Sequence, residues 1–233
     1  MTKKIAVVGA TGRMGRLALE LIEDSSDLSV FATLDSKTEL TAALGADAIF
    51  DVTRLDVSAE VVAFAQANSI PIVVGTSGWS AQKLSTLDAK GSAVVVIPNF
   101  SVGSMLASRF AAEAAKFFDS IEIVETHHAG KVDSPSGTAV RTAEQISASR
   151  GNTPLIPGVG QEARGEIVAG VPIHSLRLEG AIAKQSVLLG SESELLTISH
   201  EASSVSAYSA GILASIRFAL GATGVHVGLE SVL

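Results

Sequence analysis

The sequence predicts an α/β protein: a Rossmann-like, doubly wound parallel sheet joined to a second α+β domain with a mostly antiparallel sheet. Three observations support this prediction. In the first hundred residues, continuous apolar runs alternate with stretches of helical periodicity, which is typical of βαβ units. A glycine-rich loop follows the first apolar run. After residue 170, apolar and polar residues alternate, as in strands with one covered face.

Strands and helices are expected to alternate in the first part of the chain. Each predicted strand is a short run rich in β-branched residues. The strands are expected at residues 4–9 (KIAVVG), 28–35 (LSVFATLD), 47–53 (DAIFDVT), 70–76 (IPIVVGT) and 92–100 (SAVVVIPNF), and the main helices at 13–25 and 58–69. Because crossovers between parallel strands are right-handed, these elements form one sheet with helices on both faces.

The pattern changes after residue 100. In order, we expect a helix at 102–118, a strand at 121–128, a helix at 137–149, a mobile Gly/Pro-rich stretch at 151–170, and antiparallel strands at 171–180, 183–191 and 193–203. A last helix, about 206–220, and an apolar tail return to the first sheet. The chain is therefore expected to form two domains, one of residues 1–102 with 206–233 and an inserted one of residues 103–205.

Composition excludes several classes of protein. The formal net charge of -7 argues against a nucleic-acid partner, which requires a basic face. The absence of cysteine excludes disulfides and thiolate metal sites and fits a cytoplasmic protein. The apolar run near the start is too short for a signal peptide, and the most apolar helix, at 209–220, carries Arg217 and is too short to cross a bilayer. We expect no membrane partner.

The glycine loop after the first predicted strand indicates a dinucleotide site. Gly9, Gly12 and Gly15 allow a tight turn and a close approach of the backbone to a pyrophosphate at a helix N-terminus. Thr11 stands at the usual middle glycine, so a turn that only packs strand on helix is the alternative. Asp35 ends the second strand where a carboxylate would hold the ribose, and Lys37 could meet a 2′-phosphate. The predicted cofactor is NADH or NADPH.

The stretch HHAGKVDSPSGT, residues 127–138, indicates an anion site with proton donors. Asp133 or Ser134 is the expected N-cap, with Pro135 at the first helical position, so that the N–H groups of residues 136–138 point outward. His127 and Lys131 could supply general acid chemistry and charge pairing. Surface histidines are one alternative. A metal site is another, but with five histidines and no cysteine we predict none.

The motifs VGATGRMG, VVGTSGW, IPNFSVG and ETHHAGKVDSPSGTA together resemble the 4-hydroxy-tetrahydrodipicolinate reductase (dihydrodipicolinate reductase) family of bacterial lysine biosynthesis. The likeness spans nearly the whole chain, including GVPIHSLRL and the terminal VGLE. It implies that residues 1–102 with 206–233 form a dinucleotide-binding domain for the nicotinamide cofactor, and that residues 103–205 form a substrate-binding and oligomerisation domain whose sheet forms a homotetramer. The substrate implied is a small cyclic dicarboxylate, whose reduction needs a hydride on one carbon and a proton on its neighbour.

The same resemblance implies roles for individual residues. His127 would be the catalytic acid/base and Lys131 the proton donor, while His128, Gly137 and Thr138 would hold the substrate carboxylates. The residues implied for the cofactor are Gly9, Ala10, Thr11, Gly12, Arg13 and Met14 at the pyrophosphate, Asp35 and Lys37 at the ribose, and Gly75, Thr76, Ser77, Pro98, Asn99 and Phe100 at the nicotinamide.

The sequence departs from the family pattern at three places. Gly130 stands where a larger polar residue is usual. Trp79 and Ser77 replace the phenylalanine and the second threonine of GTTGF. Val205 stands where an arginine is expected near the histidine loop, and the loss of that cation bears on full activity rather than on family membership.

Three other classes of protein could share parts of this pattern. Short-chain dehydrogenases need a Tyr-x-x-x-Lys pair, and the only tyrosine, Tyr208, is followed four residues later by Ile212. A homologue that binds nucleotide and dicarboxylate without turnover stays open, as does a reductase of another imine or carbonyl acid. The presence of both His127 and Lys131 favours the reductase, because a binder without turnover has no need of both.

Overall fold

In the computed structural model the chain divides into two compact units, Met1–Val102 with Val205–Leu233, and Gly103–Ser204. The structure describes residues 2–87, 91–151, 156 and 161–233. The boundary predicted from the sequence lies one residue further along, after Val205. We call the first body unit 1 and the second unit 2.

Unit 1 is built on a six-stranded sheet in the order β11-β5-β4-β3-β1-β2, and all of its pairings are parallel. Its elements are β1 (Lys3–Val8), α1 (Arg13–Glu23), β2 (Leu28–Leu34), β3 (Ala48–Asp51), α2 (Leu55–Ala67), β4 (Ile72–Val74), α3 (Ala81–Ser85), β5 (Ala93–Val96), α6 (Ser209–Ala219) and β11 (Gly224–Val227). This confirms the Rossmann-like layer. The apolar tail returns as the edge strand β11.

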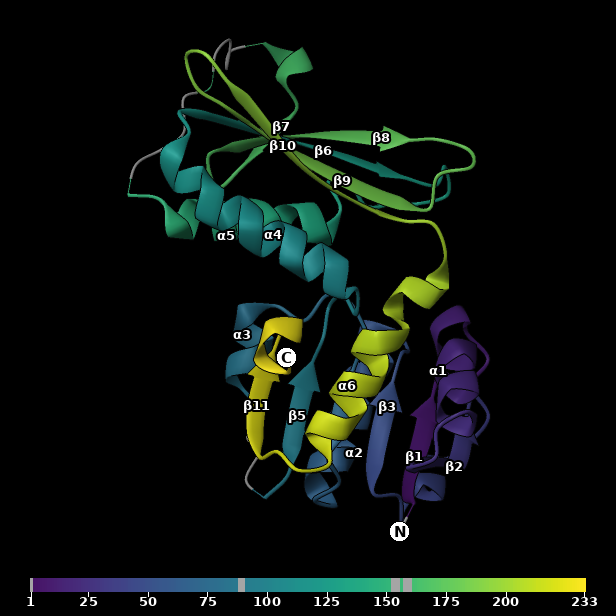
Figure 1. Ribbon diagram of the computed structural model, residues 1–233. Coiled ribbons are helices and arrows are strands. Elements are labelled where there is room, and N and C mark those ends of the chain that lie inside the picture. Colours follow the sequence, from purple (N-terminus) through teal and green to yellow (C-terminus); the bar gives the residue numbers. More distant parts are fainter. Residues whose placement is uncertain (1, 88–90, 152–155, 157–160) are drawn as a thin grey trace. The chain divides into compact units, whose positions relative to one another are not determined.

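Helices cover both faces of this sheet (Figure 1). The apolar face of α2, with Val61 and Val62, packs on one side against Ile49, Ile72 and neighbouring strand residues. The helices α1 and α6 contact each other and lie on the other side. Continuous burial of β3, β4 and β5 explains why these strands are apolar at successive positions rather than at alternate ones, with Asp51 at the end of β3 as the exception.

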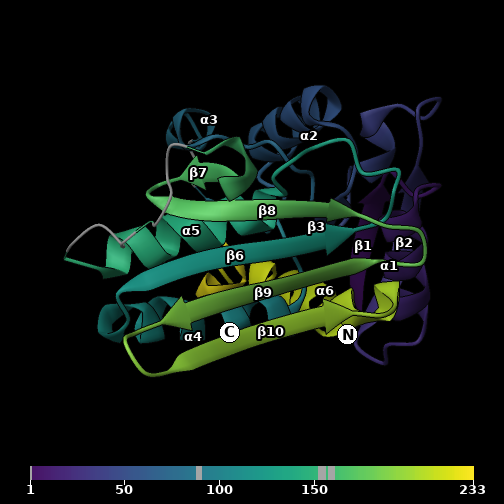
Figure 2. The same ribbon diagram turned by 90° about the horizontal axis from the view of Figure 1, so that it is seen from above.

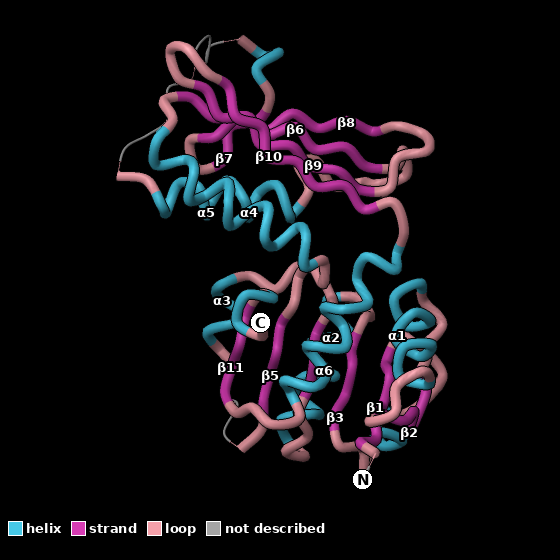
Figure 3. Tube along the Cα trace, viewed as in Figure 1, coloured by secondary structure: helices cyan, strands magenta, loops and turns pink. Residues whose placement is uncertain are grey.

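Unit 2 is a five-stranded sheet in the order β10-β9-β6-β8-β7. Its elements are α4 (Val102–Ala114), β6 (Ser120–His127), α5 (Gly137–Ser149), β7 (Glu166–Val168), β8 (Val171–Arg177), β9 (Ala183–Gly190) and β10 (Leu195–Ala202). Figure 3 shows α4 and α5 along one face of this sheet. There they bury the inward residues of the strands, such as Ile121, Ile123 and Ile173.

The sheet of unit 2 is mostly antiparallel, as predicted. The strand β9 is antiparallel to β6 and β10, and β7 is antiparallel to β8, but β8 runs parallel to β6 (Figure 2). A parallel pair needs a crossover, and α5 lies in the chain between these two strands. The second sheet is therefore mixed, and Ser175 and Arg177 of β8 lie beside Glu125 and His127 of β6.

Short 3-10 turns complete both units: Leu40–Ala43, Ala115–Phe117, Glu162–Arg164, Val205–Tyr208 and Leu229–Ser231. The last predicted helix thus begins as a 3-10 turn before α6. Mobility was expected for residues 151–170. Much of that stretch lies outside the described residues, and its described part contains a 3-10 turn and β7. Among the residues described, no helix is both long and apolar enough to cross a membrane.

Candidate active site

The glycine loop joins β1 to α1 in unit 1. Gly9 has a φ of +84°, and a Cβ there would lie 2.8 Å from the carbonyl oxygen of Val52. A Cβ on Gly15 would lie 2.2 Å from the carbonyl oxygen of Gly9, so the third glycine lets α1 pack on the loop. Gly12 is the N-cap of α1, no side chain caps the helix there, and the first turn holds no acidic residue. This helix end suits an anion, because its N–H groups and dipole are positive.

Asp35 lies beside this loop. The backbone N–H groups of Gly9 and Ala10 donate to the carbonyl oxygen of Leu34, at 3.0 and 3.1 Å, and so join the loop to the end of β2. The Asp35 carboxylate accepts hydrogen bonds from the Lys37 backbone N–H and from the Thr38 hydroxyl, both at 2.9 Å. These bonds lower the pKa of Asp35, so the carboxylate is ionised at neutral pH. An ionised carboxylate accepts a bond from a ribose hydroxyl and repels a phosphate.

The residues predicted for the nicotinamide follow β4 and β5, at the same edge of the sheet. A Cβ on Gly75 would lie 2.6 Å from the Phe100 ring, so the glycine admits that ring. Phe100 is buried and lies with its ring centroid 5.6 Å from that of Phe50. Asn99 accepts the Ser101 N–H at 2.9 Å. The loop after β4, at Gly75, and the loop after β5, at Phe100, are therefore in contact.

A buried carboxylate that the sequence analysis missed supports these loops. Asp51, the last residue of β3, is fully buried. It accepts hydrogen bonds from Ser58 at 2.5 Å, from Thr53 at 2.6 Å and from Thr76 at 3.0 Å. Trp79, one of the departures from the family pattern, donates its indole N–H to Ser58 at 3.2 Å. Burial raises the pKa of Asp51.

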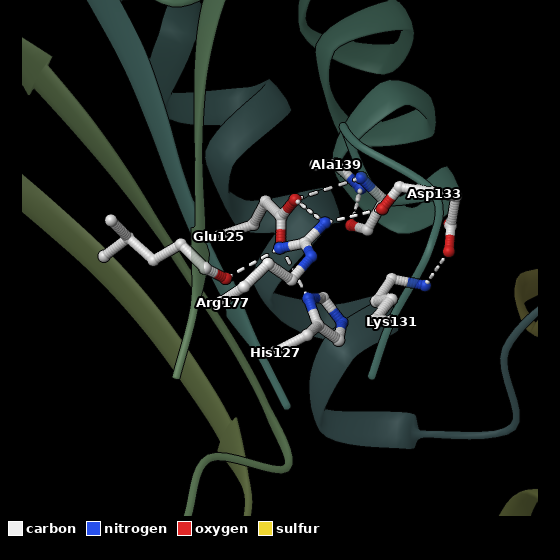
Figure 4. Close-up of polar contacts among 8 residues, drawn as sticks. Glu125, His127, Lys131, Asp133, Ala139 and Arg177 are labelled. Atoms are coloured by element: carbon white, nitrogen blue, oxygen red, sulfur yellow. Dashed lines mark hydrogen bonds and ion pairs between the residues drawn. The ribbon is translucent and has the colours of Figure 1, made fainter. Parts of the chain in front are cut away.

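In unit 2, His127 lies at the end of β6 with its ring on the side of α5 (Figure 4). Its Nδ1 is 2.5 Å from Oε2 of Glu125, which is fully buried two residues earlier on the same face. Arg177 of β8 donates to both oxygens of Glu125 at 2.9 Å, and the Ser136 N–H donates to Oε1 at 3.2 Å. Neither Glu125 nor Arg177 was predicted as a site residue.

Electrostatics keep this cluster charged at Glu125 and neutral at His127. Burial would raise the pKa of Glu125, but the hydrogen bonds from Arg177 and His127 outweigh it and hold that pKa below its usual value. For His127, burial is the largest cause and lowers its pKa. The nearby charges of Lys131 and Arg177 act in the same direction against the opposing effect of Glu125. A neutral imidazole beside two cations can accept or pass on a proton near neutral pH.

The start of α5 differs from the prediction. Ser136, not Asp133 or Ser134, is the N-cap, because its backbone is extended (φ -65°, ψ 146°) and its hydroxyl accepts the Ala139 N–H at 3.2 Å. The bond from Ser136 N–H to Glu125 holds the residue outside the helix. Pro135 therefore precedes the cap, and the helix begins at Gly137.

Lys131 and Asp133 lie in the loop that leads to this helix. The Lys131 ammonium is 2.7 Å from Oδ1 of Asp133 (Figure 4). Burial would raise the pKa of Asp133, but the bonds from Lys131 and from the Gly137 backbone lower it overall. An internal anion thus already pairs with the lysine at the start of α5.

The residues predicted to hold the substrate carboxylates, His128, Gly137 and Thr138, do not form a cluster like that of Glu125 and His127. His128, the next residue along the chain, is exposed, and a Cβ on Gly130 would lie 3.5 Å from its Nδ1. Gly137 is open, with nothing within 4 Å of an added Cβ. Thr138 follows it on the first turn of α5. Over the part of the chain that the structure describes, no cluster of three or more His, Cys, Asp or Glu side chains could hold a metal ion.

A Rossmann-type sheet with this glycine loop, combined with a unit that gathers a histidine, a lysine and a helix N-terminus, defines an oxidoreductase that uses a nicotinamide cofactor. Comparison with known proteins gives the family. The model "Dihydrodipicolinate reductase, N-terminus" matches residues 3–100, and "Dihydrodipicolinate reductase, C-terminus" matches residues 103–233. The chain belongs to the dihydrodipicolinate reductase family.

Curated relatives and a solved structure agree with this membership. A 4-hydroxy-tetrahydrodipicolinate reductase of Clavibacter sepedonicus is 51% identical, covering 100% of this chain and 87% of the relative. The one of Cutibacterium acnes is 40% identical, covering 99% and 98%. A dipicolinate-bound dihydrodipicolinate reductase from a Paenisporosarcina species is 27% identical with a TM-score of 0.82, covering 100% of both chains. A myo-inositol dehydrogenase from Corynebacterium glutamicum, 14% identical with a TM-score of 0.56 and covering 94% of this chain and 87% of its own, shares the fold alone.

Proposed function

We propose that this protein reduces 4-hydroxy-tetrahydrodipicolinate to tetrahydrodipicolinate in the diaminopimelate route to lysine, with the 4-hydroxyl group leaving as water. The observation that supports this most is the cluster at the end of β6, where a neutral His127 lies near Lys131 and the N-terminus of α5. Its relatives carry the same activity in their names. The proposal places the cofactor in unit 1 and the dicarboxylate in unit 2.

In this proposal the cofactor lies on the glycine loop. Gly9 through Met14 would bind the pyrophosphate, because glycines at 9 and 12 leave the end of α1 open. Asp35 would hold the ribose, and the loops Gly75–Ser77 and Pro98–Phe100 would line the nicotinamide. When bound, the reduced nicotinamide supplies the hydride.

The protein's own residues would then bind the substrate and move the proton. One carboxylate would replace Asp133 as the acceptor of the Gly137 N–H and would also accept the N–H of Thr138, and His128 would help to hold the substrate. Lys131, which now pairs with Asp133, would turn to the substrate and donate the proton that the neighbouring ring carbon takes up. His127 would act as acid/base, since its neutral ring can exchange a proton near pH 7.

The direct test is to mix the protein with freshly generated substrate and either cofactor, and to follow nicotinamide absorbance. We expect turnover, and Lys131→Ala should lose about 100-fold or more in kcat with unchanged affinity for NADH. Lys116→Ala is the matched control, because this lysine of unit 2 pairs with Glu113 at 2.8 Å in an exposed ion pair. Binding of both ligands without turnover would identify a non-catalytic homologue instead.

Cofactor choice follows from Asp35. Its ionised carboxylate favours the free 2′-hydroxyl of NADH, and Lys37 partly offsets its repulsion of a 2′-phosphate. We therefore propose that both cofactors are used, with NADH at least as good as NADPH. A preference for NADPH above about 100-fold in kcat/KM, or roughly 2.7 kcal/mol, would show that Asp35 does not face the ribose.

The carboxylate site is tested by Thr138→Val, which keeps the shape of the side chain and deletes one donor. We expect the affinity for pyridine-2,6-dicarboxylate to fall roughly tenfold, or about 1.4 kcal/mol, because the backbone donors remain. Affinity for NADH should not change. Unchanged dicarboxylate affinity would mean that the carboxylate is held elsewhere.

We further propose that the protein assembles as a homotetramer through the sheet of unit 2. Support comes from the sheet face turned away from α4 and α5. There Ile167, Leu176 and Leu195 are 41%, 44% and 69% exposed. Exposed apolar side chains on a sheet face are typical of an interface between protein chains. Light scattering should give four times the mass of the chain, and Leu176→Asp should give smaller species.

A further inference from the structure

The contacts around His127 support an inference about the role of Glu125. We infer that Glu125 is a positioning residue for His127: its carboxylate accepts the Nδ1–H of the imidazole and leaves Nε2 as the nitrogen that exchanges protons with the substrate. This inference rests on the catalytic function proposed above for His127. It assigns no contact between Glu125 and the substrate.

The donors around Glu125 fix the direction of the bond to His127. The carboxylate receives two N–H groups of Arg177 and the N–H of Ser136, and none of these groups can act as an acceptor. A carboxyl surrounded by such donors is ionised and can only accept. At 2.5 Å from Oε2, the Nδ1 of His127 must therefore carry the proton, and Nε2 of the neutral ring has the lone pair.

Burial makes this geometry rigid. Glu125 is fully buried, and the side chain of Arg177 is 20% exposed. Arg177 also donates to the carbonyl oxygens of Leu176 and Asp133, at 2.7 and 2.6 Å, so it joins β8 to the loop that contains Lys131. Rotation of the His127 ring by half a turn would leave the Glu125 lone pair without its donor. An imidazole held by a carboxylate in one tautomer is a recurring arrangement at acid/base sites.

The same strand provides a matched control on its opposite face. Glu122 accepts from His174 at 2.7 Å and pairs with Arg164, so it too joins a histidine to an arginine. It lies three residues before Glu125 and so on the other side of β6, away from the proposed site. Glu122→Gln removes the same charge from the same kind of cluster without touching His127.

The test combines turnover with the tautomer of the histidine. Glu125→Gln should lower kcat about 10- to 100-fold, as expected when the partner of a functional histidine is removed. Affinity for NADH and for pyridine-2,6-dicarboxylate should stay within about twofold, because neither ligand is assigned a contact with Glu125. Glu122→Gln should keep the kcat of the parent and its oligomeric state. In a His127→Gln background, Glu125→Gln should cause no further loss, since both changes remove one function.

A spectroscopic measurement on the unmodified protein keeps the inference testable even if Glu125→Gln does not fold. In a long-range ¹H–¹⁵N correlation spectrum of the ¹⁵N-histidine-labelled protein, the signal lost in His127→Gln should be a neutral ring protonated on Nδ1. A ring protonated on Nε2 would overturn the inference, and so would a kcat for Glu125→Gln equal to that of Glu122→Gln. Full turnover by His127→Gln would instead overturn the proposed role of His127, and the inference with it.

Discussion

Asp51 in unit 1 and Glu125 in unit 2 are both fully buried, and both lie near the carboxyl end of a central strand. Their side-chain partners differ in charge. Asp51 accepts from neutral donors, the hydroxyls of Thr53, Ser58 and Thr76 and the Thr53 backbone N–H, whereas Glu125 accepts from a guanidinium and an imidazole. Burial raises the pKa of Asp51, while the pKa of Glu125 is lowered. Two carboxyls without solvent exposure thus shift in opposite directions, and the bonds from Arg177 and His127 hold the pKa of Glu125 down.

The difference matches what each carboxyl does in its unit. Asp51 connects the segment after β3 to the loop after β4 by hydroxyl bonds, and this requires acceptor oxygens but no neighbouring charge. Glu125 fixes the orientation and tautomer of an imidazole, and this requires that it stay ionised. A buried anion is kept only where a cation pairs with it.

The largest expected effect is at Arg177. Arg177→Met leaves Glu125 buried without its cation, so we expect a loss of about 3–5 kcal/mol in the free energy of unfolding. The control is Arg217→Met: Arg217 makes a similar two-bond pair with Asp27, but that pair is about half exposed. There the loss should be below about 1 kcal/mol. Equal losses in urea unfolding would mean that Glu125 does not depend on its partner's charge.

A smaller effect is expected from one hydroxyl of the Asp51 cluster. Ser58→Ala removes the 2.5 Å bond to Asp51 and the acceptor of Trp79, and two other side-chain donors to Asp51 remain. We expect a loss of about 1–2 kcal/mol in urea unfolding. Ser85→Ala serves as the control, because that exposed hydroxyl contacts only the Gln82 carbonyl, and it should change stability by less than about 0.5 kcal/mol. A loss as large as that of Arg177→Met would remove the contrast between the two carboxyls.

The smallest effect is expected for Asp51→Asn, and it should depend on pH. The folded-state pKa of Asp51 is raised above 3.8, so the folded protein binds more protons than the unfolded one between the two pKa values. The parent therefore gains stability from Asp51 as pH falls through the raised pKa, and the asparagine variant does not. Its cost, about 1 kcal/mol or less at neutral pH, should grow toward pH 5.

Glu125 should respond to pH in the opposite direction. Its folded-state pKa lies below 4.5, so its stabilisation is fully present above the unfolded pKa and is lost as pH falls through the folded one. Unfolding free energies of the parent and of Asp51→Asn, measured from pH 8 to pH 4, separate the two contributions. A cost for Asp51→Asn that shrinks on acidification would contradict the raised pKa of Asp51.

Local patterns predicted most of the fold and missed the pairing that completes the site. The five strands of the first hundred residues and the return of the tail to the first sheet could be predicted, because burial on both faces leaves continuous apolar runs. The parallel pairing of β6 with β8 could not, since register between distant strands has no local signal. Without the pairing of β6 with β8, nothing in the sequence placed Arg177 beside Glu125.

One signal for the missed cluster was nevertheless present. In β6 the inward positions are Ile121, Ile123 and then Glu125, and a charged residue at an inward position requires a buried partner. The cap of α5 was misassigned for a different reason. Pro135 suggested a first helical position, but the tertiary bond from Ser136 N–H to Glu125 moved the cap beyond it.

The return of the chain to unit 1 has a consequence for synthesis on the ribosome. Residues 103–204 emerge before α6 and β11, so unit 2 can fold while unit 1 still lacks a helix and its edge strand. Until then β5 has an unpaired edge, and the side of the sheet that receives α6 is uncovered. Gly211 fits α6 against Phe100, where a Cβ would lie 2.0 Å from the carbonyl oxygen. Unit 1 is thus completed last, although its first strand is made first.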